Sequence, residues 1–516
     1  MTAMLAMGAT PSHALLKTTT SLLDSTVDTT LGLVDDTGGL LLGDGWLVED
    51  GVETSMDHVN DVVGAKSAWR NGWTGKGVDV ALIDTGVVPV PGLTRSPVSN
   101  GPDLSLENQS ADARYLDTYG HGTHMAGIAV GRESATGGFR GVAPDAGLVS
   151  LKLGTYDGAV DVSQVIAAID WVVQHRRSDG LNIRVLNLSY GTSSTQSPQL
   201  DPLSHAVENA WRNGIVVVVS SGNNGNTAAL STPATNPYVV AVGAADTAGT
   251  VGHSDDTVAK FSSGGSSARR PDLVAPGRSI VSLRDPGSYI DVNYSTARVG
   301  DKLFKGSGTS QAAAVVSGAA ALLLQQRPGL TPDQVKALLT RNAASIAGGD
   351  PKAGAGMVRV DRALSASTPS TRQTWTASTG TGSLEAARGM AHVADDGTEL
   401  TGEHTILGPW SATPWSTAST AGTAWTGGVW QGQTWTADCW CGTSWAPRTW
   451  GHAPWVGQTW AGNDWASRSW KVGTWDSRSW KESAWDSRSW KDGSWESRSW
   501  KGGSWLAGTW NGAGPP

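Results

Sequence analysis

Cysteine is almost absent from this chain of 516 residues, which has only two, Cys439 and Cys441. The residues before them hold no thiol, which excludes a cysteine nucleophile and a disulfide framework over most of the sequence. The two cysteines are separated by a single residue, so a disulfide between them would be strained. We expect them to be free thiols or to form disulfides between chains.

Long apolar runs and an excess of positive charge are absent as well. The sequence has no run of 18 apolar residues, so we expect no membrane-spanning helix. The net charge of -8 argues against a nucleic-acid-binding protein, which would normally present a basic face. The chain is too long for one ordinary domain, and we expect two or three units.

The N-terminal residues lack the positive charge of an ordinary secretory signal. Residues 4–10 are mildly apolar, and Ser12-His13-Ala14 fits a small-x-small cleavage site. We interpret residues 1–14 as a shortened signal sequence, with an unstructured leader as the alternative. Residues 15–55 are rich in Thr, Asp, Leu and Gly without a clear period, and we interpret them as a leader or short pro-segment.

Three short motifs supply an acid, a base and a hydroxyl group in one order along the chain. They are Asp84-Thr85-Gly86, Gly120-His121-Gly122-Thr123-His124 and Gly308-Thr309-Ser310. A serine hydroxyl is a poor nucleophile at neutral pH, so it needs an imidazole to take its proton and a carboxylate to orient that imidazole. We therefore predict that Asp84, His121 and Ser310 form a catalytic triad.

The chain resembles the subtilases, the subtilisin-like serine peptidases, from about Thr54 to about Ser365. The resemblance rests on the three motifs in the subtilisin order Asp, His, Ser, and on two further segments, at 188–191 and 218–225. It implies a three-layer α/β fold and a serine endopeptidase that works through an acyl-enzyme. It also implies an oxyanion hole formed by the Asn223 side chain and the backbone N–H of Ser310.

The same resemblance implies which residues bind the substrate. Two segments would flank the main specificity pocket and a third would form its base: Ser189, Tyr190, Gly191, Ser220, Ser221, Gly222 and Ser231. No unpaired carboxylate falls in these segments, so we expect a broad preference for neutral to apolar side chains. Asp117 either influences a neighbouring subsite or is a solvated loop residue.

Residues 56–365 alternate short apolar runs with helical patterns. The runs rich in Val, Ile and Leu are 78–83, 147–153, 183–188 and 215–219. Apolar residues at spacings of three and four between 165 and 173 predict a helix, and Thr331-Pro332-Asp333-Gln334 predicts a capped helix start. Such alternation predicts a mostly parallel sheet with helices on both faces.

The composition changes after the predicted peptidase domain. We interpret residues 366–424 as a linker, which begins rich in Ser and Thr. From Trp425 to Trp510 every fifth residue is tryptophan, and residues 425–516 are interpreted as a repeat tail. A step of five scatters tryptophans around a helix, whereas in an extended chain ten residues restore the same face. We therefore predict an extended, β-rich or disordered tail.

These observations predict a secreted or surface-attached serine endopeptidase that acts on proteins or peptides. The tail would contact cell-wall material or another polysaccharide, self-associate, or serve only as a spacer. The alternative is a structural or adhesive surface protein whose subtilase domain processes only itself or its neighbours. We expect no required cofactor and no metal in the site. Structural calcium is left open and unassigned, since Glu133 to Arg140 contains one carboxylate.

Overall fold

The computed structural model describes residues 46–48, 53–93, 98–108, 113–135, 137–390, 392–395, 398–406, 408–434 and 448–449. The proposed signal sequence at 1–14, both cysteines and most of the tryptophan repeats lie outside the described residues. The resemblance to the subtilases falls almost wholly within them.

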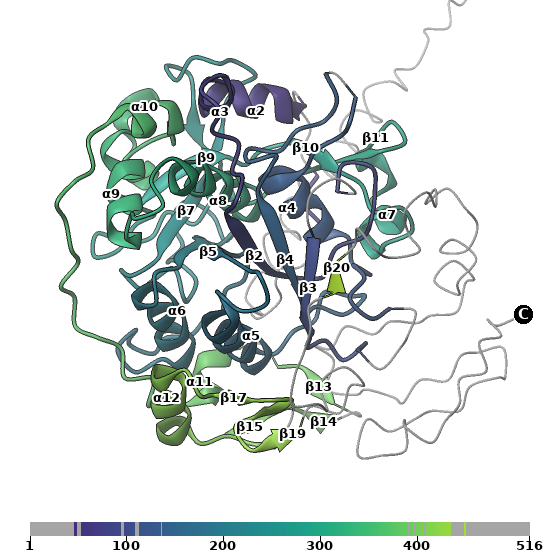
Figure 1. The fold of residues 1–516 in the computed structure, drawn as a ribbon, viewed down its shortest axis with the longest axis vertical. Coiled ribbons are helices and arrows are strands. Elements are labelled where there is room, and N and C mark those ends of the chain that lie inside the picture. The colour runs from purple at the N-terminus through teal and green to yellow at the C-terminus, as the bar shows by residue number, and fades with distance from the viewer. Residues whose placement is uncertain are drawn as a thin grey trace, which may run out of the picture. The chain divides into compact units, whose positions relative to one another are not determined.

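A nine-stranded, mainly parallel sheet forms the centre of the domain (Figure 1). In spatial order its strands are β20 (Arg448–Thr449), β3 (Val98–Asp103), β4 (Gly147–Lys152), β2 (Asp79–Asp84), β5 (Ile183–Leu188), β6 (Val216–Ser220), β7 (Val240–Asp246) and β8 (Thr257–Val258), and β9 (Leu273–Pro276) also pairs with β7. Within the described part, β8 and β20 run antiparallel to their neighbours. The four predicted apolar runs form β2, β4, β5 and β6, because strands covered on both faces are apolar at nearly every position.

Helices cover both faces of the sheet, as the alternating pattern predicts. α4 (His121–Val130) packs with α8 (Thr309–Gln326), and α5 (Val162–His175) packs with α6 (Pro202–Arg212) on the other side of the strands (Figure 1). Capping boxes start α5, at Asp161 and Gln164, and α9 (Pro332–Arg341), at Thr331 and Gln334. The predicted capped helix start is therefore confirmed. The other helices of the peptidase domain are α2 (Met56–Val62), α3 (Ala65–Arg70), α7 (Tyr289–Asn293) and α10 (Val360–Ser365).

A second, four-stranded sheet leads the chain into α8. Its order is β1 (Thr54–Ser55), β10 (Ile280–Leu283), β12 (Leu303–Gly306) and β11 (Arg298–Val299). β12 ends two residues before Gly308, the N-cap of α8. This second sheet, which is separate from the main sheet, therefore positions the segment that leads to Ser310.

The residues expected to form a linker are instead folded against the peptidase domain. α11 (Leu384–Arg388) contacts α5 and α6, and α12 (Ala412–Ala421) contacts α6, below the main sheet in Figure 1. Between and after them lie short antiparallel strands: β13 (Ala394–Asp395) with β14 (Thr398–Glu399), β15 (His404–Thr405) with β16 (Gly408–Pro409), and β17 (Trp425–Thr426) with β18 (Val429–Trp430) and β19 (Gln433–Thr434). The prediction of a linker over 366–424 was therefore wrong.

Tryptophan side chains account for this packing. Trp410, Trp415, Trp425 and Trp430 are buried and their ring centroids form a chain of contacts 4.9–6.2 Å apart. Burying an indole stabilises the folded state through the large apolar area removed from water. The first two tryptophans of the predicted repeat tail, Trp425 and Trp430, thus belong to the folded domain, and the boundary at residue 425 is also corrected.

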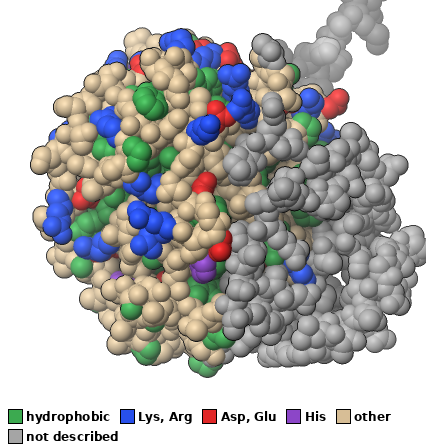
Figure 2. All heavy atoms as spheres, in the orientation of Figure 1, with side chains coloured by type: hydrophobic (Ala, Val, Ile, Leu, Met, Phe, Trp, Pro, Cys, Tyr) green, Lys and Arg blue, Asp and Glu red, His purple; other side chains and the backbone are tan. Residues whose placement is uncertain are grey.

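The surface of the described part shows mixed charge. On the face in Figure 2, Lys and Arg side chains are scattered among neutral and acidic ones. Of the helices in the described ranges, none has both the length and the apolar character needed to cross a bilayer.

Candidate active site

The carboxyl end of β2 presents Asp84 to His121. The Asp84 Oδ1 lies 2.7 Å from Nδ1 of His121 and accepts a hydrogen bond from the Thr85 backbone N–H at 2.8 Å. Both side chains of the pair are buried. Because a carboxylate only accepts, Nδ1 carries the proton, and the lone pair of the neutral ring is on Nε2. The predicted pairing of Asp84 with His121 is thus present in the structure.

Glycines allow α4 to approach the turn after β2 closely. A Cβ on Gly122 would lie 2.0 Å from the Gly86 carbonyl oxygen, a distance that no side chain tolerates. Gly120, the N-cap of α4, has φ 107°, in the left-handed region that favours glycine. The glycines around His121 therefore allow the close packing of α4 against the turn after β2. His121 occupies the first position of this helix.

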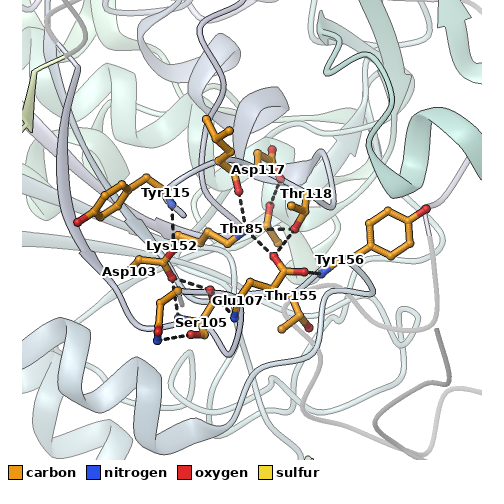
Figure 3. A network of polar contacts seen from close by, with 12 residues as sticks. Thr85, Asp103, Ser105, Glu107, Tyr115, Asp117, Thr118, Lys152, Thr155 and Tyr156 are labelled. Carbon is orange, nitrogen blue, oxygen red and sulfur yellow. Dashed lines mark hydrogen bonds and ion pairs between the residues drawn. The ribbon is translucent and has the colours of Figure 1, made fainter. Parts of the chain in front are cut away.

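Asp117 holds the start of α4 in place (Figure 3). Its carboxylate accepts hydrogen bonds from the backbone N–H groups of Gly120 at 2.6 Å and Thr123 at 2.7 Å, and from the Thr85 hydroxyl at 2.7 Å. Thr85 Oγ1 in turn accepts from the Gly122 N–H at 2.9 Å. Asp117 is fully buried and burial raises its pKa, so the interpretation as a solvated loop residue was wrong. Its position four residues before His121 was the only signal in the sequence.

A buried lysine fastens the loop that precedes Asp117. Lys152, at the end of β4, donates to Glu107 at 2.7 Å and to the Thr118 hydroxyl at 3.1 Å, as Figure 3 shows. Glu107 also accepts from the Thr118 hydroxyl at 2.7 Å and from the Tyr156 N–H at 2.7 Å. A buried charge is tolerated only when it is paired and hydrogen-bonded, which this cluster achieves. The cluster ties the carboxyl edge of the main sheet to the loop that carries Asp117.

Ser310 is the second residue of α8, next to Asn223. The Asn223 Oδ1 accepts from both the backbone N–H and the hydroxyl of Thr309, each at 2.9 Å. The Gly222 N–H donates to the Thr309 hydroxyl at 3.3 Å. With its oxygen held in this way, the Asn223 amide has one orientation beside the start of α8. The structure therefore brings Asn223 and the Ser310 segment together as the resemblance implies.

His121 and Ser310 share no hydrogen bond in the described structure. Nε2 of His121 is buried and has no hydrogen-bond partner among the described residues. Catalytic hydrogen bonds of unliganded enzymes are often long and tighten only with substrate. Of the predicted triad, the structure thus joins Asp84 to His121 directly.

The predicted substrate-binding segments converge on Ser231. A Cβ on Gly191 would lie 2.6 Å from the Ser231 Cβ, and a Cβ on Gly222 would lie 2.6 Å from the Ser231 Oγ. The Ser231 N–H donates to the Ser221 carbonyl at 3.1 Å. Ser189 and Ser220 stand at the carboxyl ends of β5 and β6, which lead into these segments. Two main-sheet strands and one loop therefore meet where the resemblance places a pocket.

The Tyr190 side chain, like that of Ser189, is buried rather than presented in a cleft. Burial raises the pKa of its hydroxyl well above the ordinary value, and Asp161 adds to the effect. The Tyr190 ring thus belongs to the core behind the predicted substrate segment. A contact with substrate through the Tyr190 ring is not supported.

The one carboxylate of the region considered for calcium, Glu133, has partners within the protein. Glu133 accepts from the Phe139 N–H at 3.2 Å and from Lys302 at 3.1 Å. In the described ranges no cluster of three or more His, Cys, Asp or Glu residues is arranged to hold a metal ion. Glu133, the one carboxylate of residues 133–140, is thus paired with Lys302, and both the open assignment of structural calcium and the absence of a required cofactor stay predictions.

Comparisons with known proteins agree with this geometry. Residues 75–382 match the model of the subtilase family. The chain belongs to the subtilase family. The serine protease AprX of Bacillus subtilis is 39% identical over 324 residues, which span 61% of this chain and 72% of AprX. Subtilisin DY of Bacillus licheniformis is 32% identical over 305 residues, covering 58% of this chain and 96% of that protein.

This subtilase is a serine endopeptidase, as its family and its Asp84–His121 pair indicate. Its substrates are therefore peptides or proteins. A third relative, the minor extracellular protease Epr of Bacillus subtilis, is 30% identical over 318 residues, which cover 61% of this chain but 43% of Epr. The match to the family model, at residues 75–382, includes the site and does not extend to the tryptophan repeats beyond residue 434.

Proposed function

We propose that Ser310, His121 and Asp84 hydrolyse peptide bonds through an acyl-enzyme. His121 Nε2 takes the proton of the Ser310 hydroxyl as the oxygen attacks the scissile carbonyl carbon. The same proton then passes to the leaving amine, and water repeats the sequence to release the acyl group. The observation that carries the proposal is the buried 2.7 Å contact between Asp84 and His121, which fixes the ring with Nε2 available.

Asn223 and the backbone N–H of Ser310 would stabilise the negative oxygen that forms during attack. The fixed orientation of the Asn223 amide supports this role, because preorganised donors need no rearrangement in the transition state. The exposed N–H groups at the start of α8 also favour negative charge there.

A fluorophosphonate probe tests the nucleophile. The full chain should be labelled covalently, and Ser310→Ala should abolish labelling while the circular dichroism spectrum stays unchanged. Ser295→Ala, at an exposed serine, is the matched control and should label like the parent. Equal labelling of Ser310→Ala would contradict the assignment.

We further propose a broad preference for neutral to apolar side chains at the main pocket. The pocket segments at 189–191, 220–222 and 231 contain no carboxylate that could bind a basic side chain. A peptide library with all residue types at the position before the cleaved bond tests this. Strong selection of Arg or Lys would overturn it.

Secretion or surface attachment is also a proposal, supported by the extracellular relative Epr and by the unusual tail. The rival is a structural or adhesive protein whose peptidase domain processes only itself or its neighbours. Hydrolysis of an added, unfolded protein separates the two, because the rival predicts none. Mass spectrometry of the protein from native culture would fix both termini and the compartment.

The tail beyond Thr449 would serve placement rather than catalysis. Trp425 and Trp430 are part of the fold and β20 pairs with β3 of the main sheet, so the informative truncation ends at Thr449. This shortened chain should cleave a short peptide as fast as the full chain, yet lose retention on cell-wall or polysaccharide material, since weak contacts of repeated units add together. Equal retention of both chains would assign the repeats to spacing or self-association.

A further inference from the structure

Residues 192–200, which we call the pocket loop, follow the predicted substrate segment at 189–191. Thr192 forms an antiparallel bridge with Thr232, next to Ser231, and the two N–H to carbonyl hydrogen bonds of this bridge measure 2.9 and 3.0 Å. The rest of the pocket loop forms neither a helix nor a strand. Its conformation therefore depends on the groups that bond to it from outside the main sheet.

Residues 378–390 of the C-terminal segment supply such groups, and we call them the C-terminal clamp. Near the end of the pocket loop, the Gly382 N–H donates to the Leu200 carbonyl at 2.7 Å. Near its start, the Met390 N–H donates to the Ser193 hydroxyl at 3.1 Å. The clamp thus contacts the pocket loop at both of its ends.

Gln196 joins the middle of the pocket loop to the clamp. Its Oε1 accepts from the Ser383 N–H at 2.9 Å, and its Nε2 donates to the Ser383 carbonyl at 2.8 Å. One amide that bonds to both backbone groups of a single residue fixes the separation and the direction of the two segments. Because Gln196 lies five residues after Gly191, the position of the clamp is passed on to the substrate segment.

Arg388 fastens the clamp to the peptidase domain. Its Nε donates to the Asp161 carboxylate at 2.7 Å, and both side chains are fully buried. Its Nη1 donates to the Gly402 carbonyl at 2.7 Å. Breaking such a pair would leave a buried charge without a partner, so it holds α11 firmly against α5 and α6 (Figure 1). The clamp is therefore a fixed support for the pocket loop.

The clamp also lies behind the substrate segment. Burial raises the pKa of the Tyr190 hydroxyl, Asp161 raises it further, and Arg388 opposes them, because both charges are close to this residue. Leu384 and Ala387 of α11 are buried in the same core as Tyr190. A shift of the clamp would therefore disturb both the packing of Tyr190 and the loop that follows it.

We propose that the C-terminal clamp is a positioning element for substrate, which acts through Gln196 and the pocket loop to hold residues 189–191 in their binding conformation. The inference rests on the proposed function of this site. It predicts that weakening the contact raises KM for a peptide while the reacting groups stay competent. Because coupling between two sites is reciprocal, a bound substrate must also hold the clamp more tightly.

Gln196→Ala and Gln174→Ala in the full chain form a matched pair. Gln174 bonds to both backbone groups of Trp425 at 2.7 and 2.9 Å, so it holds the C-terminal segment in the same way, but from α5. Both variants should lower the melting temperature by similar amounts. Only Gln196→Ala should raise KM for a chromogenic peptide, by roughly fivefold at nearly constant kcat, because fewer molecules have the pocket loop in place.

A small fluorophosphonate without a peptide part reports on the reacting groups alone. It should label Ser310 of Gln196→Ala at the parental rate. Ser193→Ala gives an independent answer, because it removes the acceptor of the Met390 N–H at an exposed position. This variant should also raise KM for the peptide, by a smaller factor than Gln196→Ala.

Hydrogen exchange tests the reciprocal effect. Saturating the parent chain with the reversible peptide aldehyde acetyl-Ala-Ala-Phe-H should slow exchange of the Gly382 and Met390 amides more than that of Trp425. The Trp425 N–H bonds to Gln174 and serves as the internal reference. The difference should persist in Gln174→Ala at Gly382 and Met390, and it should shrink in Gln196→Ala.

The outcomes separate this inference from the proposed function. If Gln196→Ala and Gln174→Ala have the same KM, the clamp adds stability only and the inference is overturned. Slower labelling of Gln196→Ala, or equal slowing of exchange at Gly382, Met390 and Trp425, would also contradict it. If the folded parent is not labelled at Ser310 by the fluorophosphonate, the proposed function fails instead.

Discussion

Two buried carboxylates, Asp84 and Asp170, serve opposite purposes in this molecule. Asp84 bonds to the imidazole of His121, a partner that keeps a second nitrogen for proton transfer. Asp170 accepts from the indoles of Trp415 at 2.8 Å and Trp430 at 3.0 Å, and from the Ser419 hydroxyl at 2.5 Å. None of these three donors titrates near neutral pH. A buried carboxylate can therefore take part in catalysis only when its partner can transfer a proton. Asp170 has no such partner among the described residues, and it anchors the C-terminal segment instead.

Asp84→Asn should have the largest effect on activity. An amide can donate to Nδ1 and favour the wrong tautomer of His121, so kcat should fall about ten-thousandfold with little change in melting temperature. Steady-state kinetics on a short peptide, together with thermal unfolding, measure both quantities. A large loss of stability with a modest loss of kcat would show that Asp84 has a structural role, like that of Asp170.

Asn223→Ala should have the next largest effect. Its amide would act on the oxyanion in the transition state, so kcat should fall roughly a hundred- to a thousandfold while KM changes little, the magnitude being that of the equivalent donor in subtilisin. The same kinetic assay measures it, and Asn213→Ala at the end of α6 is a control outside the site. A raised KM at constant kcat would assign Asn223 to substrate binding.

Asp170→Ala should lower the melting temperature and leave kcat unchanged, which is the reverse of the effect expected for Asp84→Asn. It leaves two indole N–H groups and one hydroxyl buried without an acceptor, each costing about 1–3 kcal/mol, so the melting temperature should fall by roughly 10 °C. Below the transition kcat should match the parent. Asp301→Ala, at an exposed site, should melt like the parent. An unchanged melting temperature for Asp170→Ala would show that the C-terminal segment adds little to stability.

The sequence predicts the surroundings of Asp84 well because that information is local. The apolar run before Asp84, the glycines around His121 and the capped helix at Thr331 each act within a few residues, and the sheet follows from such runs. The contacts of Asp170 join residues 245 to 260 positions apart, and Arg388 reaches Asp161 over 227 positions. No periodicity marks either acceptor in the sequence.

Two features near the active site were not predicted from the sequence, because they too depend on contacts between distant residues. Trp46 is a single aromatic residue in a Gly-rich leader, and its partners His121 and Phe304 lie far along the chain. Asp117 stands close to His121, but its burial depends on the fold of the whole loop that Lys152 fastens. Motif spacing shows which groups react, whereas the residues that position or cover them depend on tertiary packing.

Asp285→Asn tests a third buried acid, and its effect should be the smallest. Both carboxylate oxygens of Asp285 lack a hydrogen-bond partner among the described residues. Burial raises its pKa well above the ordinary value, and the charges of Asp117 and Asp291 raise it further, while Lys152 and Arg284 oppose them. Unlike Asp84 and Asp170, this acid receives no hydrogen bond from the part of the chain that the structure describes.

The sign of the effect follows from linkage. Because the folded state holds this proton more tightly than the unfolded state, the stability that Asp285 contributes is complete below its unfolded pKa of about 3.9. That contribution is lost as pH rises from there toward the raised folded pKa. Asp285→Asn stays neutral, so it should melt a few degrees above the parent at pH 8, and the difference should shrink toward pH 4. A variant that melts below the parent at pH 8 would mean that the ionised carboxylate is stabilised in the folded protein, which would group Asp285 with Asp84 rather than set it apart.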